Sequence, residues 1–335
     1  MPELRKDPVV GRWVIIATER ARRPGNFLDQ ERTIFDQTSL CPFCDNKDFE
    51  IYKLKGDKDG KWKVKVVLNG TTILSTNEKF KRRGDGIYDV INRYGAQEVV
   101  IETPKHIANM ADLDIKQIKL VIQTYVARFK DLEKDTKLQY IMAYKNYGWA
   151  AGSRPIGHSR SQIIATSVNP LRVKEKLIGA KRHYEYRERC IYCDILRQEL
   201  EYKKRLITQT EHFVAIAPFA SRFPFEVLII PRKHHCDFAE GVIGQEEDFA
   251  RMLKDILLRF KIGLNDPAYN YVIHTAPFRQ KNKGPKWKTI EEDYHWHVEI
   301  RSRLARDAGF EKGSGFYICA IPPEDTAEFL REVDL

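Results

Sequence analysis

Two segments of the chain show the same order of apolar patterns. In the first half, strands are predicted at residues 13–17 (WVIIA), 62–68 (WKVKVVL), 96–103 (AQEVVIET), 140–146 (YIMAYKN) and 161–168 (SQIIATSV). Between the third and fourth of these strands, residues 113–135 carry apolar residues at helical spacing, which predicts a long helix.

The second half repeats this order. Its predicted strands are residues 212–218 (HFVAIAP), 225–231 (FEVLIIP), 269–275 (YNYVIHT) and 295–302 (HWHVEIRS). Residues 246–264 predict the matching long helix, and the charged segment 169–190 predicts a helix that connects the halves. The pattern indicates an α+β fold of two tandem halves, 1–172 and 173–335, each an antiparallel sheet with a long helix.

Size and composition are those of an ordinary soluble protein with two domains. The chain has 335 residues, of which 42% are hydrophobic and 31% are charged. No window approaches the roughly 18 apolar residues of a membrane span, and the N-terminus lacks the apolar core of a signal peptide. We therefore expect no membrane partner and a cytoplasmic location.

The net charge of +10 suits anionic partners, from nucleotides to nucleic acid. The densest basic run, residues 279–288 (RQKNKGPKWK), precedes His295. It is either a solvated loop or a loop that gathers phosphate over a site. A nucleic-acid partner is not expected, because no basic strand carries interleaved aromatic residues.

Each half contains a Cys-x-x-Cys pair followed by two spaced histidines. The first set is Cys41, Cys44, His106 and His158, and the second is Cys190, Cys193, His234 and His295. Two cysteines and two histidines complete a tetrahedral zinc site with no open position, so the sequence predicts two structural zinc ions per chain. His235 is a rival to His234, which is preferred because it aligns with His106. The alternatives for a Cys-x-x-Cys pair are coincidence or a redox pair, and the isolated Cys236 and Cys319 are interpreted as ordinary thiols.

These motifs resemble the galactose-1-phosphate uridylyltransferase family, a branch of the histidine-triad superfamily that also includes ADP-glucose phosphorylase. The resemblance rests on CPFC, GAQEVVIETPKH, HSRSQIIAT, APFASRFPFEVLIIPRKH and the segment that begins YHWHVEIRS. It implies two histidine-triad-like halves, a homodimer, two metal sites and a role in galactose and carbohydrate metabolism. It also implies transfer of a nucleotidyl group between a nucleotide sugar and a sugar phosphate or phosphate acceptor, through a covalent intermediate on the second histidine of a His-x-His motif.

The first half departs from this motif. His158-Ser-Arg160-Ser-Gln162 places Arg160 where the resemblance implies the nucleophile. A guanidinium stays protonated and cannot attack phosphorus, although it can bind phosphate. The nucleotide-pocket motif also departs, at residues 68–74 with Asn69. By the resemblance Ser153 and Gln162 match positions that hold phosphate oxygens; alternatively they are ordinary polar residues.

The second half keeps His-x-His in Tyr294-His295-Trp296-His297-Val298-Glu299. His297 occupies the nucleophile's place in the second repeat and is a candidate catalytic residue; alternatively it is a metal ligand or supports one. Glu299 shares its face, because residues two apart on a strand point the same way. It is a candidate to orient an imidazole, join the metal site or contact substrate; alternatively it makes ordinary structural hydrogen bonds.

The leading hypothesis is therefore an enzyme, a nucleotidyltransferase that resembles hexose-1-phosphate uridylyltransferases and nucleotide-sugar phosphorylases. The alternative is a non-catalytic, zinc-stapled nucleotide-binding protein in which Arg160 clamps a phosphate. A third hypothesis, nucleic-acid binding, rests only on the net charge and the basic run.

Overall fold

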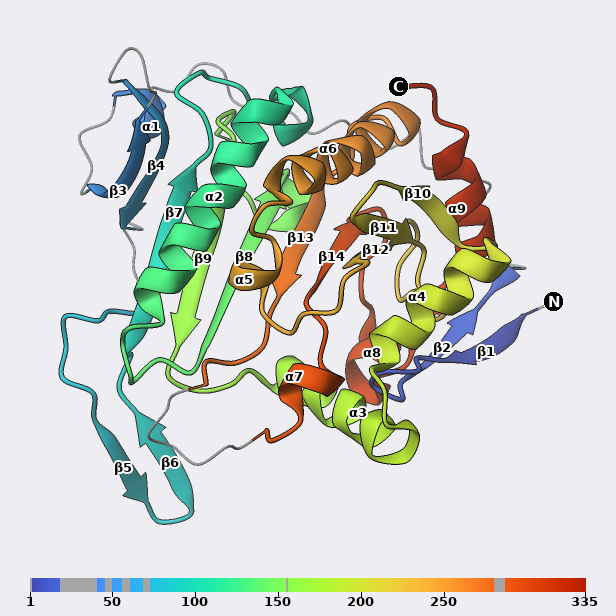
Figure 1. Cartoon of the computed structure of the whole chain (residues 1–335), viewed down its shortest axis with the longest axis horizontal. Coiled ribbons are helices and arrows are strands. Elements are labelled where there is room, and N and C mark those ends of the chain that lie inside the picture. The colour runs from blue at the N-terminus through green and yellow to red at the C-terminus, as the bar shows by residue number, and fades with distance from the viewer. Residues whose placement is uncertain are drawn as a thin grey trace.

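One ten-stranded antiparallel sheet runs through both halves of the chain (Figure 1). The computed structural model describes residues 2–18, 41–45, 50–55, 61–68, 73–154, 156–279 and 287–335. From its outer edge inward, the first half contributes β3 (Glu50–Lys55), β4 (Trp62–Leu68), β7 (Gly95–Ile101), β9 (Arg160–Thr166) and β8 (Tyr140–Tyr147). The second half continues with β13 (Tyr269–His274), β14 (His297–Ser302), β12 (Val227–Pro231), β11 (Phe213–Ile216) and β10 (Leu206–Gln209). Read from the outer edge inward, the strand order within each half is the same.

The halves meet at β8 and β13, which pair antiparallel along their length. Tyr144 of β8 lies opposite Val272 of β13. Next to this pair, Gln162 of β9 lies opposite Tyr144, and Glu299 of β14 lies opposite Val272. These four residues form one row across the centre of the sheet, and we call it the central row.

Two long helices cover one face of the sheet. α2 (Ile115–Leu132) and α6 (Glu246–Gly263) pack against each other over this face, with the short α5 (Phe238–Gly241) beside them (Figure 1). Asp114 caps α2 by accepting a hydrogen bond from the backbone N–H of Gln117. Alternate strand residues, such as Val298 and Ile300 of β14, are buried in the same hydrophobic core as these helices. The intervening strand residues therefore face the opposite side.

That opposite side is covered over the second half. α3 (Leu171–Arg187), the expected connecting helix, is followed by α4 (Ile191–Tyr202). Leu196 of α4 packs on residues of β11 and β12 that point away from α6. A small sheet of β1 (Glu3–Lys6), β2 (Trp13–Ile16) and β15 (Tyr317–Cys319) lies near α4 and joins the two ends of the chain (Figure 1). The boundary at 172/173 falls in the first turn of α3 and stays a prediction.

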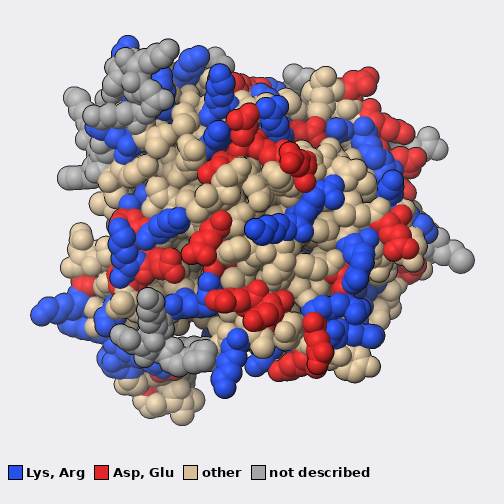
Figure 2. All heavy atoms as spheres, in the orientation of Figure 1, with Lys and Arg blue, Asp and Glu red and all other residues tan. Residues whose placement is uncertain are grey.

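The remaining elements lie at the periphery. β5 (Arg82–Asp85) and β6 (Tyr88–Ile91) form a hairpin that projects from the body (Figure 1). The short helices are α1 (Pro42–Asp45), α7 (Ile290–Asp293), α8 (Gly309–Ser314) and α9 (Pro323–Arg331), with 3-10 turns at Met110–Asp112 and Trp149–Ala151. Among the described residues, no helix combines the length and apolar character that a membrane crossing requires. On the face that carries α2 and α6, basic and acidic side chains are interspersed (Figure 2).

Candidate functional site

The first Cys/His set converges beside the outer strands of the first half. Cys41 precedes α1, and its Sγ lies 3.5 Å from Nδ1 of His158. Cys44 Sγ lies 3.4 Å from Nδ1 of His106 and 3.5 Å from Nδ1 of His158. A zinc ion with bond lengths of about 2.3 Å to sulfur and about 2.0 Å to nitrogen gives S···N edges of about 3.5 Å in a tetrahedron. The spacing of these donors therefore fits a bound metal ion.

The second set repeats this geometry. Cys190 precedes α4, and Cys193 Sγ lies 3.4 Å from Nδ1 of His234 and 3.6 Å from Nδ1 of His295. One ligand atom from each of the four residues lies within 4.8 Å of the others. The hydrogen bond from Cys190, followed by the contacts with His234 and His295, lowers the pKa of the Cys193 thiol to about 3. His235 points elsewhere and accepts from the backbone N–H of Asp237.

Backbone carbonyls orient the imidazoles in both sets. His158 Nε2 donates to the Thr103 carbonyl over 2.8 Å, and His234 Nε2 donates to the Glu291 carbonyl over 2.8 Å. Because Nε2 carries the proton in this arrangement, the lone pair of Nδ1 points toward the sulfurs. Each set is thus poised to hold a metal, which would tie α1 or α4 to the sheet.

Arg160 lies at the start of β9, on the sheet face away from α2. Its Nη2 donates to Ser153 Oγ over 2.8 Å and to the Arg154 carbonyl over 3.1 Å. Its Nη1 donates to the carbonyls of Ile156 and His158 over 3.1 Å and 3.2 Å. The guanidinium also lies over the ring of Phe43, 5.5 Å from its centroid. Arg160 therefore ties its partners on the preceding segment to the cysteine-bearing turn, and it reaches the predicted phosphate residue Ser153.

Two other predicted substrate residues have different outcomes. Gln162 lies in the central row, where its Oε1 accepts from the Tyr144 hydroxyl over 2.9 Å. Asn69 lies outside the described residues, as does most of the basic run, residues 280–286.

A buried ion pair between Lys145 and Glu102 lies behind Arg160, and the sequence did not predict it. Lys145 of β8 is fully buried, and its Nζ donates to Glu102 Oε2 over 2.6 Å, to Ser159 Oγ over 3.0 Å and to the Arg160 carbonyl over 2.9 Å. Ser159 also donates to Glu102. This network fixes the backbone between His158 and Arg160. The sequence pattern does not indicate this network, because a lysine in a strand of alternating polarity is expected to face solvent.

His297 is buried on the corresponding face of the second half. Its Nδ1 donates to the His295 carbonyl over 2.9 Å, and its Nε2 accepts from Lys176 Nζ over 2.9 Å. Its ring stacks between Tyr192 and His274, at 4.6 Å and 4.9 Å between centroids. Burial and the Lys176 ammonium hold the pKa of His297 well below its usual value, so the ring is neutral near pH 7. The lone pair that a nucleophile needs is already engaged by Lys176.

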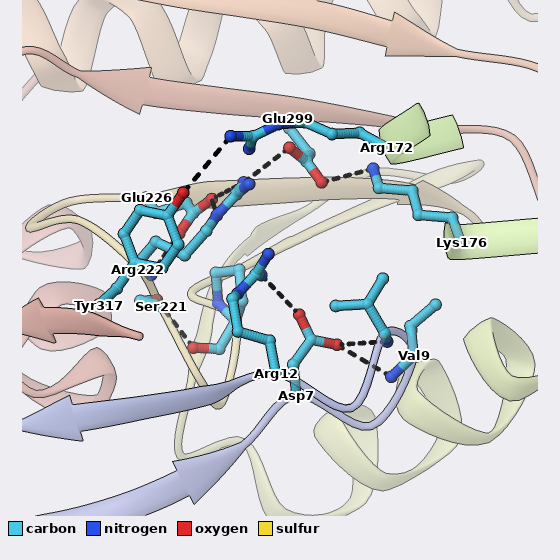
Figure 3. Close-up of polar contacts among 12 residues, drawn as sticks. Asp7, Val9, Arg12, Arg172, Lys176, Ser221, Arg222, Glu226, Glu299 and Tyr317 are labelled. Atoms are coloured by element: carbon cyan, nitrogen blue, oxygen red, sulfur yellow. Dashed lines mark hydrogen bonds and ion pairs between the residues drawn. The ribbon is translucent and has the colours of Figure 1, made fainter. Parts of the chain in front are cut away.

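Glu299 belongs to a chain of ion pairs (Figure 3). It accepts from Lys176 over 2.5 Å and from Arg222 over 2.7 Å, and Arg222 also pairs with Glu226. Although burial opposes ionisation, Lys176 and Arg222 hold the pKa of Glu299 well below its usual range. His274, His297 and Glu299 are spaced closely enough to bind a metal ion. The Lys176 ammonium lies between two of them, however, and its charge would repel a cation.

Comparisons with known proteins identify relatives over the whole length. The N-terminal domain model of galactose-1-phosphate uridyl transferase matches residues 1–170, and the C-terminal domain model matches residues 178–313. ADP-glucose phosphorylase of Arabidopsis thaliana is 35% identical, covering 100% of this chain and 93% of the relative. Galactose-1-phosphate uridylyltransferase of Thermotoga maritima is 26% identical, with coverage of 100% and 99%.

Solved structures give the same result. The crystal structure of the Arabidopsis thaliana ADP-glucose phosphorylase with bound ADP-glucose superposes with a TM-score of 0.82 at 34% identity, covering 100% of this chain and 99% of the other. A uridylyltransferase structure superposes with a TM-score of 0.75 at 27% identity, covering 99% and 97%. The expected α+β fold is therefore confirmed, and the chain belongs to the galactose-1-phosphate uridylyltransferase family of nucleotidyltransferases.

Proposed function

We propose that this protein transfers a nucleoside monophosphate from a nucleoside-diphosphate sugar to a phosphate acceptor, on the open sheet face that carries Arg160, Ser153 and Gln162. The full-length identity of 35% to an ADP-glucose phosphorylase is the observation that supports it most. The acceptor is inorganic phosphate or a sugar phosphate. The comparisons do not favour the alternative of a non-catalytic nucleotide-binding protein.

The transfer proceeds by direct attack. An oxygen of the acceptor phosphate forms a bond to the α-phosphorus, and the bond from that phosphorus to the bridging oxygen breaks. The products are a nucleoside diphosphate, or a new nucleotide sugar, and the sugar 1-phosphate that leaves with the electron pair. Arg160 cannot be the nucleophile, because its guanidinium stays protonated. His297 is not available, because its Nε2 accepts from Lys176.

Arg160 stabilises charge in this scheme. A fixed guanidinium beside Ser153 offers planar donors to phosphate oxygens, which gain charge at the transition state. To contact a phosphate, its Nη groups exchange their hydrogen bonds to the carbonyls of Arg154 and Ile156 for hydrogen bonds to the ligand. Lys145 keeps the backbone carbonyl of Arg160 in place during this exchange.

We further propose zinc at both Cys/His sets, two ions per chain, in a structural role. When bound, the metal ties α1 and α4 to the sheet, and four protein ligands leave no position for substrate. We also propose a homodimer, following the family resemblance. A cytoplasmic location is supported by the two Cys-x-x-Cys pairs, whose thiols must stay reduced to bind metal.

The proposal is tested with ADP-, UDP- and GDP-glucose, each with phosphate or a hexose 1-phosphate as acceptor. We expect one of these donor–acceptor combinations to react. Double-reciprocal plots of the initial rate should intersect, because both substrates bind before transfer. Mass spectrometry of the intact protein after exposure to the nucleotide sugar should show no nucleotidyl adduct. Replacing Arg160→Ala should lower kcat by about 10²–10³, as loss of one charge-stabilising donor does in other enzymes.

His297→Ala serves as the control, since it removes an imidazole outside the transfer site and should retain most of the activity. Loss of activity in His297→Ala, or an adduct on His297, would place the chemistry in the second half. Binding without turnover for every pair would favour the non-catalytic alternative.

A further inference from the structure

A cavity of about 860 Å³ lies in the second half, between the sheet, α3, α4 and the N-terminal segment. His297, Glu299 and Arg301 of β14 line its floor, and Lys176 of α3 reaches in from the side. Arg12 enters from the N-terminal segment (Figure 3). The cavity lies on the same sheet face as Arg160. The central row separates Gln162 from Glu299 by three strand spacings, or about 14 Å.

One end of this cavity has an excess of positive charge. Its basic residues are Arg12, Arg172, Lys176, Arg222 and Arg301. Its acidic residues are Asp7, Glu226 and Glu299, so five cations face three carboxylates. The other lining charges balance, with Lys6, Arg187 and Arg189 against Glu175, Asp194 and Glu199.

The excess charge resides on two arginines. Arg12 pairs with Asp7 over 2.9 Å, whereas Lys176 and Arg222 share Glu299 and Glu226 (Figure 3). Within the described part of the chain, Arg172 has a hydrogen bond to the Tyr317 hydroxyl at 3.4 Å, and Arg301 lies over the Phe223 ring. Among the described residues, no carboxylate lies within ion-pair distance of Arg172 or Arg301. Burial first, and then the nearby Arg222, lower the pKa of Arg301, although Glu226 and Glu299 act in the opposite direction.

Beside these balanced charges, part of the lining is apolar. Its walls include Val9, Met142, Val173, Ile191 and Ile195. Tyr192 adds an aromatic ring stacked on His297. The volume lies in the range of small-molecule pockets and far exceeds that of inorganic phosphate. On this apolar part of the lining, sugar hydroxyls would find few partners, whereas a flat nucleobase would bury its faces there.

We propose that this cavity is a second ligand site that binds a nucleoside monophosphate, with the phosphate dianion between Arg172 and Arg301 and the base against the apolar walls. The two negative charges match the two excess positive charges, and guanidinium groups bind phosphate through paired donors. The site lies in the second half, apart from the proposed transfer site of the first half, and does not depend on it.

The test is isothermal titration of the full chain with AMP, UMP, glucose 1-phosphate and inorganic phosphate. The variants are Arg301→Gln and Arg172→Gln, which remove the two arginines without leaving a paired carboxylate behind. Arg160→Gln removes an equivalent charge from the first half and is the matched control. We expect at least one of the two nucleotides to bind, and each cavity variant to weaken one binding event by about tenfold to a hundredfold, as loss of a charge-assisted hydrogen bond does. Arg160→Gln should leave that event unchanged.

Unchanged nucleotide affinity in both cavity variants would overturn the proposal, as would an effect of Arg160→Gln alone. Glucose 1-phosphate binding as tightly as the nucleotide, with the same dependence on Arg301, would overturn the assignment of a nucleoside. Arg172 is exposed on α3, so Arg172→Gln tests the site even if Arg301→Gln misfolds.

Discussion

At the residue scale, equivalent positions of the two halves have acquired different chemistry. Arg160 and His297 occupy matching places, yet one ties down a loop and the other is held between two rings. The Cys/His sets could be predicted from spacing, because each Cys-x-x-Cys pair is local. Lys176, Arg222 and His274 were missed as partners of His297 and Glu299, because they come from separate elements and only packing brings them together.

Cys190→Ser should release one metal equivalent and lower the unfolding midpoint, because the substitution removes a thiolate ligand from the second Cys/His set. Metal content by elemental analysis should fall from about two to about one per chain. Cys236→Ser is the matched control: Cys236 is also buried, but it lies outside this set and should keep both ions. Equal losses in the two variants would contradict the assignment of Cys190.

His274 should make stability depend on pH. Burial first, and then Lys176, lower the pKa of His274 from 6.5 to about 4. The unfolded chain therefore binds more protons between about pH 4 and pH 6.5, and the stabilisation present above pH 6.5 is lost as the pH falls through this window. The loss should reach about 3 kcal/mol for this group. Urea unfolding at several pH values should show a smaller pH dependence in His274→Asn, and an unchanged dependence would contradict the argument.

At the element scale, strands and helices of strong periodicity were predicted within a few residues. α2 and α6 lie inside the predicted helices, and β4 matches residues 62–68. The short β10, β15 and the β5–β6 hairpin were missed, because three or four residues give too little alternation to identify a strand. The union of the two predicted sheets into one was also not predicted. Pairing between β8 and β13 joins strands far apart in the chain, so it leaves no local pattern in the sequence.

The Lys145–Glu102 pair should be essential for the strand that carries Arg160. Lys145→Met leaves the buried Glu102 carboxylate without its cation, which should cost about 3–5 kcal/mol of unfolding free energy. The double variant Lys145→Met/Glu102→Leu removes both charges and should recover part of this loss. Urea unfolding of the two single variants and the double variant would reveal the coupling, and strictly additive losses would contradict it.

At the scale of the whole molecule, the continuous sheet should make unfolding cooperative. Backbone N–H and C=O groups of β8 and β13 form hydrogen bonds with each other. Neither half can therefore unfold without breaking the hydrogen bonds at the centre of the sheet. Hydrogen exchange by mass spectrometry should therefore show peptides from 140–147 and 269–274 opening together as urea is raised. Earlier opening of one peptide set would show that the halves unfold separately.

The central row also has a symmetry. If Tyr144 is matched with Val272 and Gln162 with Glu299, a half-turn about the Tyr144/Val272 contact maps the Lys145/Tyr271 pair onto the Ala143/Ile273 pair. The same half-turn maps the Gln162/Tyr144 pair onto the Glu299/Val272 pair. This is the isologous geometry of two identical subunits, here joined in one chain through α3. In such a pair of separate subunits every substitution would occur twice. In one chain it occurs once, so the covalent link allows the first half to carry Arg160 at the position where the second half carries His297.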